Sequence, residues 1–378
     1  MRSLCLATTL LAAGCSCSQD YSFSGGFGEL PVVPSEAEPG EIGPFVDFDT
    51  APEGERITMA YYDGSESGVG YAVGTVDEEG VVTWAYEQVD GYAEGKRGKY
   101  VSQATAADGT VWVAYLDDDT DELRVRQRIG GGEWGEAIAV GEGGLWTDMV
   151  MVGSRPVVLH THQSDGSLRL ATLIDGSWAS SVIYQSTDTP GILPDGTEGT
   201  LSAEVLYPRA VLEGDTLHIA LYDAARGQLH VLSGDADGTS SGDFSDQIVQ
   251  GNGAGNWPSM ILHDGELHIA YQSVEAQVLR LAVRDGDGWL LETVDRGPMR
   301  GADTELYVDA DGNLRILYFD GWDANLLEAT LGPDGWTSQI IRGQGTAAGF
   351  HNAVGGVGAF RYAGTYDYTT DAYEIFRL

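Results

Sequence analysis

The chain has 378 residues, of which 42% are hydrophobic and 10% aromatic, so it can bury a large core and is too apolar to be disordered as a whole. Its 20 Lys and Arg residues against 58 Asp and Glu give a formal net charge of −38, a negative field that excludes nucleic acid, anionic lipid and anionic sugars as ligands. With 53 Gly, only 12 Pro and many short β-branched or aromatic runs between Gly/Asp turns, the chain is predicted to be all-β.

The first residues have the pattern of an export signal. Arg2 is followed by an apolar run over 4–13, too short to span a bilayer, and then by Gly14-Cys15. The run Leu11-Ala12-Ala13-Gly14-Cys15 resembles the bacterial lipobox, although Ala12 stands where that motif usually has Leu. The resemblance implies a signal peptide over 1–14, a lipid anchor on Cys15, and a location facing the periplasm or the surface of a bacterial cell. An ordinary secretory peptide cleaved nearby is the alternative.

The segment that follows, 15–43, is rich in Ser, Gly, Pro and Glu and is predicted to be a lipidated tether. All three cysteines, Cys5, Cys15 and Cys17, precede the predicted domain. That domain therefore has no disulfide framework and no cysteine nucleophile or metal ligand, and packing must stabilise it.

An internal repeat is the most informative feature of the rest of the chain. An apolar strand ending in an aromatic and an acid recurs at 57–63, 111–117, 217–223, 267–273 and 314–320, with divergent copies at 156–162 and 361–367. A strand precedes each copy and a third follows it. In six copies a fourth strand opens with an aromatic, at Trp84, Trp134, Trp178, Phe244, Trp289 and Trp336. Four short strands per unit predict a propeller blade, so residues 44–378 are predicted to form a seven-bladed β-propeller.

The last blade reaches Leu378 after only three strands. We expect the apolar stretch Phe27 to Val33 to supply its outer strand and close the ring. Pro31 fits such a strand, because one edge of an outer strand makes no ladder hydrogen bonds.

The aromatic after each Gly/Asp turn, as in Asp175-Gly-Ser-Trp178 and Pro333-Asp-Gly-Trp336, resembles a degenerate form of the Asp-box repeat of sialidase-like propellers. The full spacing of that box does not occur, and in that family the box is structural, so the resemblance implies a fold and not an activity. Sialidase chemistry, as the family implies it, needs three arginines for the substrate carboxylate. Only Arg209 is basic among the aligned inner-strand positions, so sialidase activity is not expected.

Because the inner strands of a propeller line its central channel, residues at one aligned position form a ring around the axis. The third position of each inner strand is polar in every blade, and reads Asp47, Ser102, Asp148, Arg209, Ser259, Glu305 and Asn352. Two residues earlier, six blades have an aromatic, at Phe45, Tyr100, Trp146, Tyr207, Trp257 and Phe350, and the sixth blade has Asp303. The turn after each second strand adds Asp63, Asp117, Asp223, Asp320 and Asp367 on the same face.

An aromatic collar around a polar, acidic throat suits a protein ligand or a neutral or cationic glycan, bound without catalysis. The alternative interpretation is that the aromatics only pack between blades. Two other functions stay open. One is a glycoside hydrolase or lyase of sialidase-like architecture, with Glu305 and either Asp47 or Asp148 as its carboxylate pair. The other is a structural subunit of a cell-envelope assembly.

No cofactor is expected. His160 and His162 could bind a metal but are interpreted as a surface pair, and His218 and His268, which match between two blades, as structural. The acidic run from Asp117 to Glu122 could bind calcium, but a solvated turn is preferred. Two long connections are candidate contact loops, at 187–200 and at 92–99, and the second contains both lysines of the chain, Lys96 and Lys99.

Overall fold

The computed structural model describes residues 42–50, 54, 56–91, 95–129, 132–192 and 197–378. The predicted signal peptide, the lipidation site Cys15, nearly all of the tether and the predicted closing strand Phe27 to Val33 lie outside these residues. The first strand begins at Ile42, two residues before the predicted start of the propeller.

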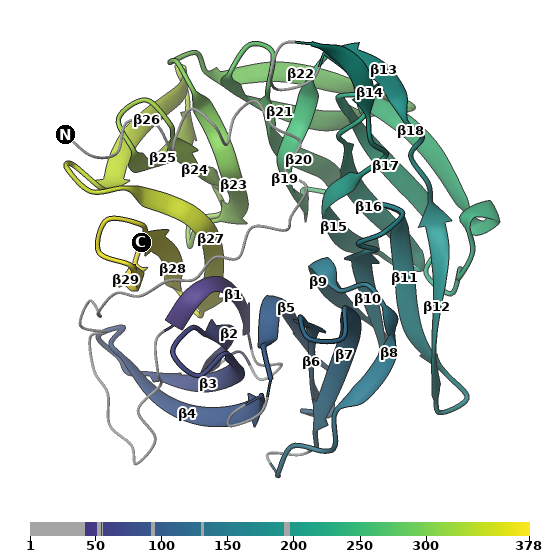
Figure 1. Cartoon of the computed structure of the whole chain (residues 1–378). Coiled ribbons are helices and arrows are strands. Elements are labelled where there is room, and N and C mark those ends of the chain that lie inside the picture. The colour runs from purple at the N-terminus through teal and green to yellow at the C-terminus, as the bar shows by residue number, and fades with distance from the viewer. Residues whose placement is uncertain (1–41, 51–53, 55, 92–94, 130–131, 193–196) are drawn as a thin grey trace.

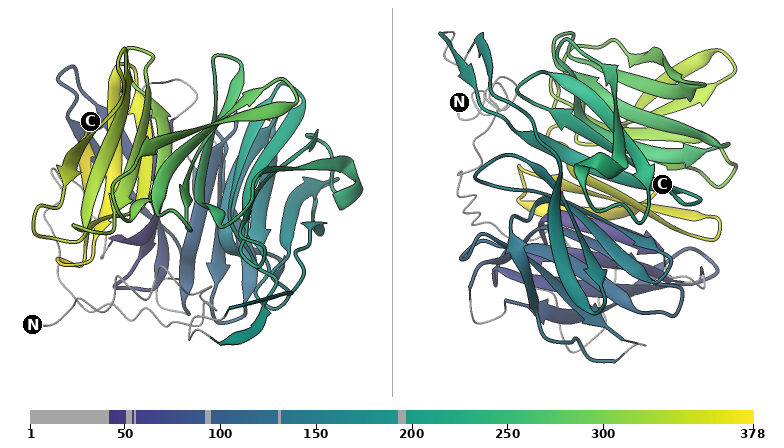
Figure 2. Two further views of the ribbon diagram at one scale, coloured as in Figure 1. Left: turned by 90° about the horizontal axis from the view of Figure 1, so that it is seen from above. Right: turned by 90° about the vertical axis from the view of Figure 1, so that its right-hand side faces the viewer.

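Seven antiparallel sheets stand around a central axis like the blades of a propeller (Figure 1, Figure 2). The inner strands are β1 (Ile42–Thr50), β5 (Arg97–Thr105), β9 (Leu145–Val152), β15 (Val205–Glu213), β19 (Ala254–His263), β23 (Arg300–Val308) and β27 (Ala348–Val357). The second strands are β2 (Arg56–Asp63), β6 (Val111–Asp117), β10 (Arg155–Thr161), β16 (Thr216–Asp223), β20 (Glu266–Ser273), β24 (Leu314–Asp320) and β28 (Phe360–Asp367).

The third strands are β3 (Gly68–Val76), β7 (Glu122–Arg128), β11 (Leu168–Ile174), β17 (Gln228–Asp235), β21 (Val278–Asp285), β25 (Asn325–Gly332) and β29 (Ala372–Arg377). The outer strands are β4 (Val82–Asp90), β8 (Ile138–Glu142), β12 (Ser177–Tyr184), β18 (Phe244–Gln250), β22 (Gly288–Asp295) and β26 (Gly335–Arg342). The predicted seven-bladed all-β fold is confirmed, and every inner strand falls where the repeat predicted it. Trp134 differs from prediction: it forms an isolated bridge with Arg128 ahead of β8 rather than opening that strand.

The seventh sheet has three strands among the described residues, in the order β27-β28-β29. It packs directly against the first blade across the seam of the ring. The Tyr362 hydroxyl donates to the carbonyl oxygen of Gly80 at 2.8 Å, and the Thr50 hydroxyl donates to that of Gly356 at 2.7 Å. Both bonds join residues near opposite ends of the chain, so side-chain contacts hold the two end blades together.

The core lies between the blades. All seven residues of β6 are buried, because neighbouring blades cover both faces of a second strand, whereas half of the residues of the outer strand β22 are exposed and only one is buried. Each apolar cluster joins two adjacent blades. In one of them Tyr71 of the first blade packs with Val113 and Tyr115 of the second. Stability thus comes from face-to-face packing of sheets, as expected for a domain without disulfides.

The five turn aspartates have a structural role. Asp63, Asp117, Asp223, Asp320 and Asp367 are each at most 1% exposed. Each carboxylate accepts backbone N–H groups of its own turn; Asp367 Oδ1, for example, accepts the N–H of Thr369 at 2.8 Å. Such capping fixes the turn between the second and third strands. These carboxylates are thus buried within their turns and are absent from the lining of the central cavity described below.

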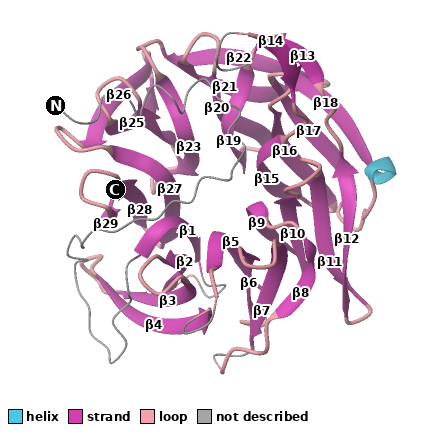
Figure 3. Ribbon diagram, viewed as in Figure 1, coloured by secondary structure: helices cyan, strands magenta, loops and turns pink. Residues whose placement is uncertain are grey.

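The long connection between the third and fourth blades carries a separate hairpin, β13 (Thr189–Ile192) paired with β14 (Glu198–Leu201). The only helix among the described residues is a single 3₁₀ turn, Ser241–Asp243 (Figure 3). Within the described part of the chain, no helix is long and apolar enough to span a membrane.

Candidate functional site

A cavity of about 830 Å³ opens at the face where the inner strands begin, at the centre of the ring. Its volume lies within the range of about 300–1,000 Å³ typical of small-molecule sites. Inner strands of all seven blades contribute to its wall. Among the predicted site residues, the lining includes Phe45, Asp47, Tyr100, Ser102, Trp146, Tyr207, Arg209, Trp257, Glu305, Phe350 and Asn352, and it omits Asp148 and Ser259.

An arc of stacked rings forms the upper wall of this cavity. Six half-buried rings follow one another around the axis: His351, Phe45, Tyr100, Trp146, Tyr207 and Trp257. Successive ring centroids are 5.1, 4.6, 4.7, 4.4 and 5.6 Å apart, with interplanar angles between 34° and 68°. Each ring thus packs against the ring of the next blade and also lines the cavity.

A β-bulge places these side chains. In six inner strands the ladder gains one extra residue here, as between Leu206 and Arg209, which pair with Tyr222 and Ala220. The residue that begins each bulge has a positive φ between 48° and 54°, and these residues are Tyr100, Trp146, Tyr207, Trp257, Asp303 and His351. A left-handed backbone at a large non-glycine residue is strained, and its repetition shows that the fold imposes it at the mouth.

The seventh blade departs from the predicted alignment by one residue. His351, not Phe350, begins its bulge, and Ala353, not Asn352, pairs with Gly364 as the ring residues of the other blades pair with their second strands. Phe350 is the residue immediately before this bulge, and its ring packs against that of Phe319, with centroids 4.2 Å apart. The collar still has an aromatic ring in this blade, but it is an imidazole. Asn352 lines the cavity, but Ala353 occupies the third position of this blade.

Three members of the third-position ring connect neighbouring blades. Asp47 Oδ2 accepts the backbone N–H of Gln103 at 2.8 Å, Asp148 Oδ2 accepts that of Ala210 at 2.6 Å, and Ser259 Oγ accepts that of Leu306 at 2.9 Å. In each pair the N–H donor directly follows the third-position residue of the next blade: Gln103 follows Ser102, Ala210 follows Arg209 and Leu306 follows Glu305. These bonds satisfy backbone groups on inner strands that pair on one side only, so part of the polar ring is structural.

Arg209 is the one cation of the polar ring, and it lies between acids from two other blades. Its guanidinium nitrogens are 3.4 Å from Asp148 Oδ1 and 3.7 Å from Glu305 Oε2. Its side chain remains 39% exposed, against 16% for Asp148 and 21% for Glu305, because it reaches into the open channel. The nearby acids hold the pKa of Arg209 above its ordinary value although burial acts to lower it, so the guanidinium stays charged.

The acids around this arginine favour their neutral forms. Burial raises the pKa of Asp47 to about 8, that of Glu305 to about 7 and that of Asp303 to about 6, and it also raises the pKa of Asp148. At neutral pH these values favour the protonated form of Asp47 and leave Glu305 partly protonated, whereas Asp303 stays mostly ionised. The throat is therefore less negative than its residue types suggest.

Three polar groups of the cavity wall have no hydrogen-bond partner within the described structure: Ser102 Oγ, Asn352 Oδ1 and Trp146 Nε1. Ser102 is 3% exposed and Asn352 is 5% exposed. Buried polar groups are nearly always hydrogen-bonded, so these three unpaired groups are exceptions at the wall of the cavity.

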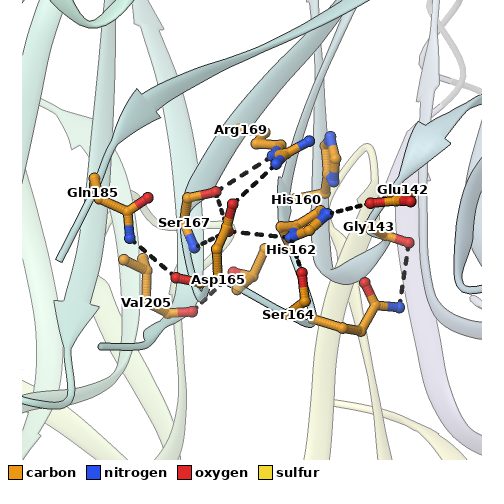
Figure 4. Close-up of polar contacts among 12 residues, drawn as sticks. Glu142, Gly143, His160, His162, Ser164, Asp165, Ser167, Arg169, Gln185 and Val205 are labelled. Carbon is orange, nitrogen blue, oxygen red and sulfur yellow. Dashed lines mark hydrogen bonds and ion pairs between the residues drawn. The ribbon is translucent and has the colours of Figure 1, made fainter. Parts of the chain in front are cut away.

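The histidine pair lies elsewhere and is not on the surface. His160 is 0% exposed and His162 is 4% exposed, which corrects the interpretation of a surface pair. Both side chains have partners: His160 Nε2 is 3.0 Å from Ser180 Oγ, and His162 Nε2 is 3.1 Å from Glu142 Oε2, a contact drawn in Figure 4. Burial lowers the pKa of His160 to about 3, which keeps its ring neutral. No group of three or more His, Cys, Asp or Glu side chains in the described residues could hold a metal ion.

The acidic run is paired with basic groups. Asp117 Oδ2 is 3.1 Å from Arg97 Nε and 2.7 Å from Arg124 Nε, and Asp118 Oδ2 is 2.8 Å from Lys99 Nζ. Asp119 Oδ2 accepts the backbone N–H of Lys96 at 2.9 Å. These contacts tie the lysine-bearing loop to the turn of the same blade. His218 is likewise satisfied, with Nδ1 2.8 Å from Ser233 Oγ.

Three residues of the site were not expected from the sequence. Phe319, Tyr368 and His351 all line the cavity. Phe319 and Tyr368 belong to the repeat motif and the turn after it, positions that the alignment treated as core and surface. His351 was hidden by the alignment of the seventh blade. A search for the bulge, rather than for strand starts, would have found it.

No protein-family model matches the sequence, and no curated protein does. Solved structures share the fold. An ulvan lyase of polysaccharide lyase family PL25 superposes with a TM-score of 0.60 at 10% identity, over 90% of this chain and 94% of that chain. Hydrazine synthase of Kuenenia stuttgartiensis gives a TM-score of 0.56 at 14% identity, over 93% of this chain and 99% of that chain.

A Hadza microbial sialidase is also similar, with a TM-score of 0.47 at 11% identity over 88% of this chain and 65% of that chain, a score too low to carry an argument. At these identities the comparisons establish the β-propeller fold and nothing about ligand or chemistry. The chain is a seven-bladed β-propeller that shares its architecture with functionally unrelated proteins.

Proposed function

We propose that this chain is a non-catalytic binding protein that recognises a neutral saccharide in the cavity at the propeller mouth. The observation that carries the proposal is the arc of six rings from His351 to Trp257, which frames a cavity of about 830 Å³. Aromatic faces pack against the apolar C–H surface of sugar rings, and polar groups below them bind the hydroxyls. The Arg209 guanidinium, whose side chain is 39% exposed in the lining of the cavity, is suited to that second task.

The electrostatics of the cavity favour an uncharged ligand. The net charge of −38 repels anionic sugars at long range. Inside the cavity Arg209 already has acidic partners, and protonation of Asp47 removes one of the negative charges that a cationic ligand would need. A neutral, hydroxyl-rich molecule has no charge to desolvate and can both donate and accept hydrogen bonds.

Binding to an array of neutral, cationic and anionic glycans tests the proposal. We expect selective binding to neutral saccharides, and Trp146→Ala should weaken it at least about tenfold, because central aromatic anchors contribute most of a binding free energy. Trp289→Ala is the matched control, since Trp289 lies on an outer strand with its indole N–H bonded to Gln247 Oε1 at 3.0 Å. Absence of saccharide binding by the intact protein would refute the proposal, as would equal loss in both variants.

A hydrolase is the second candidate function, and the raised pKa of Glu305, about 7 through burial, favours it. A carboxyl that stays protonated near neutral pH in an accessible cavity can act as a general acid. If the protein is such an enzyme, Glu305→Gln will abolish turnover of a bound saccharide and leave its affinity nearly unchanged. A binding protein shows no product with either form after prolonged incubation.

We also propose that the protein is exported and anchored to a membrane by lipid on Cys15. The support is the lipobox-like run that ends at this cysteine and the tether composition of the residues after it. Mass spectrometry of the protein made in a bacterial host should find a diacylglyceryl-modified Cys15 at the mature N-terminus. Cys15→Ser should release the protein from the membrane fraction, whereas Cys17→Ser should not.

A further inference from the structure

The cavity is asymmetric. Inner strands of all seven blades line it, but turns between second and third strands line it, among the described residues, only in the sixth and seventh blades. These turn residues are Gly321, Ala324, Tyr368, Thr369 and Asp371. In that sector the cavity therefore extends from the axis toward the rim of the propeller.

The same sector contains the break in the aromatic arc. The sixth blade has Asp303 at the bulge position, and its carboxylate accepts the backbone N–H of His351 instead of presenting a ring. Aromatic side chains continue outward instead: Phe350 packs against Phe319 and against Tyr368, with ring centroids 4.2 and 5.7 Å apart. The site thus has an apolar surface along the direction in which it is open.

Trp322 belongs to the turn between β24 and β25, whose residues Gly321 and Ala324 line the cavity in this sector. Its side chain does not line the cavity and is 68% exposed. The turn itself is fixed, because Asp320 Oδ1 accepts the N–H of Trp322 at 2.9 Å. The matching turn position in the other blades with this turn is small or polar, namely Ser65, Asp119, Ala225, Glu275 and Thr369. Among the exposed large hydrophobic residues of the described chain, Trp322 is the most exposed and the only aromatic one.

We propose that the ligand is a chain of sugar units that fills the central cavity with one end, leaves between the turns of the sixth and seventh blades, and stacks on Trp322. The inference rests on the proposed function and adds the length and direction of the ligand. The proposed ligand is an extended oligosaccharide, because a single sugar in the central cavity would not contact a side chain at the rim. A saccharide that continues outward covers the aromatic path and the exposed indole together.

Isothermal titration calorimetry with neutral β-1,4-linked oligomers of glucose, xylose, mannose and N-acetylglucosamine, each of one, two, four and six units, tests this. For the sugar that binds, we expect affinity to rise with chain length by about tenfold or more from one unit to six. Trp322→Ala should remove most of that gain and leave the single unit unaffected. Leu290→Ala is the control, since Leu290 is 60% exposed on the outer strand of the fifth blade.

The outcomes separate the two proposals. If none of the oligomers binds the intact protein, the proposed function fails and this inference with it. If binding occurs but affinity is independent of length, or if Trp322→Ala changes affinity for one and six units equally, the inference fails alone. Light scattering gives a further arm: a dimer that Trp322→Ala converts to a monomer would assign the indole to a contact between two copies and overturn the inference.

Discussion

Asp47 and Gln103 lie 56 residues apart and hold each other from neighbouring inner strands: Asp47 Oδ2 accepts the Gln103 backbone N–H at 2.8 Å, and Gln103 Nε2 donates to the Asp47 carbonyl at 2.7 Å. Gln103 donates both bonds, one from its backbone and one from its side chain, and together they fix the first blade against the second at the wall of the channel. The same geometry, with one bond, recurs at Asp148 and at Ser259.

Removing the acceptor of Asp47 should therefore destabilise the ring. At pH 5, where the carboxyl is neutral, Asp47→Ala leaves the Gln103 N–H without a partner, and we expect a loss of about 1–3 kcal/mol in the free energy of unfolding. Asp47→Asn keeps an acceptor oxygen and should cost less. Urea unfolding of both variants checks this, and equal losses would contradict the bridging role.

The raised pKa of Asp47 predicts a stability that falls with rising pH. Burial raises the folded-state pKa of Asp47 to about 8 and that of Glu305 to about 7, above the ordinary values of about 4. The folded protein then holds more protons than the unfolded chain up to pH 8, so each group lowers the free energy of unfolding by at most about 1.4 kcal/mol per pH unit.

The informative window is pH 6.5–8.5. At lower pH the buried, neutral rings of His160 and His351, whose pKa values burial lowers to about 3, act in the opposite direction. Within the window, Asp47→Asn should make the decline shallower than in the unaltered protein, as measured by denaturant midpoints. Parallel curves for the two proteins would show that Asp47 does not carry the proton.

Gly143 should tolerate no side chain. Its φ is +129°, and a Cβ there would lie 2.2 Å from His160 Nδ1. We expect Gly143→Ala to destabilise the protein by about 2–3 kcal/mol, because both backbone strain and overlap with a buried ring oppose it. Gly176, with a φ of +79° and nothing within 4 Å of its Cβ position, is the control, and Gly176→Ala should cost only about 1 kcal/mol. Equal thermal shifts would contradict the close contact.

The closing strand predicted over Phe27 to Val33 can be tested by truncation. The seventh sheet has three strands among the described residues, so β29 offers a free edge for one more. A protein lacking residues 1–35 should melt at least about 5 °C below one lacking residues 1–26, because only the second keeps the proposed strand. The same melting temperature for both would show that this stretch does not stabilise the ring.

The repeat made the blades predictable, because each inner strand follows the same sequence of turn and apolar run. The site was predictable only in part. The seventh blade has the same bulge as five others, but its aromatic Phe350 lies one residue before the bulge, so Phe350 was aligned in place of His351. The partner of Asp47 could not be predicted either, since a backbone N–H has no sequence signature. His160 was placed on the surface because polar residues usually lie there, whereas both faces of its strand are covered.

The bulges at the mouth also bear on how this scaffold can change. Because the ladder runs in regular register after each bulge, the residue that begins it can vary without disturbing strand pairing there, and Asp303 already stands where other blades have rings. Ligand selectivity in relatives of this propeller can therefore diverge one blade at a time while the architecture stays constant. A library restricted to these six positions would explore new specificities on an unaltered frame.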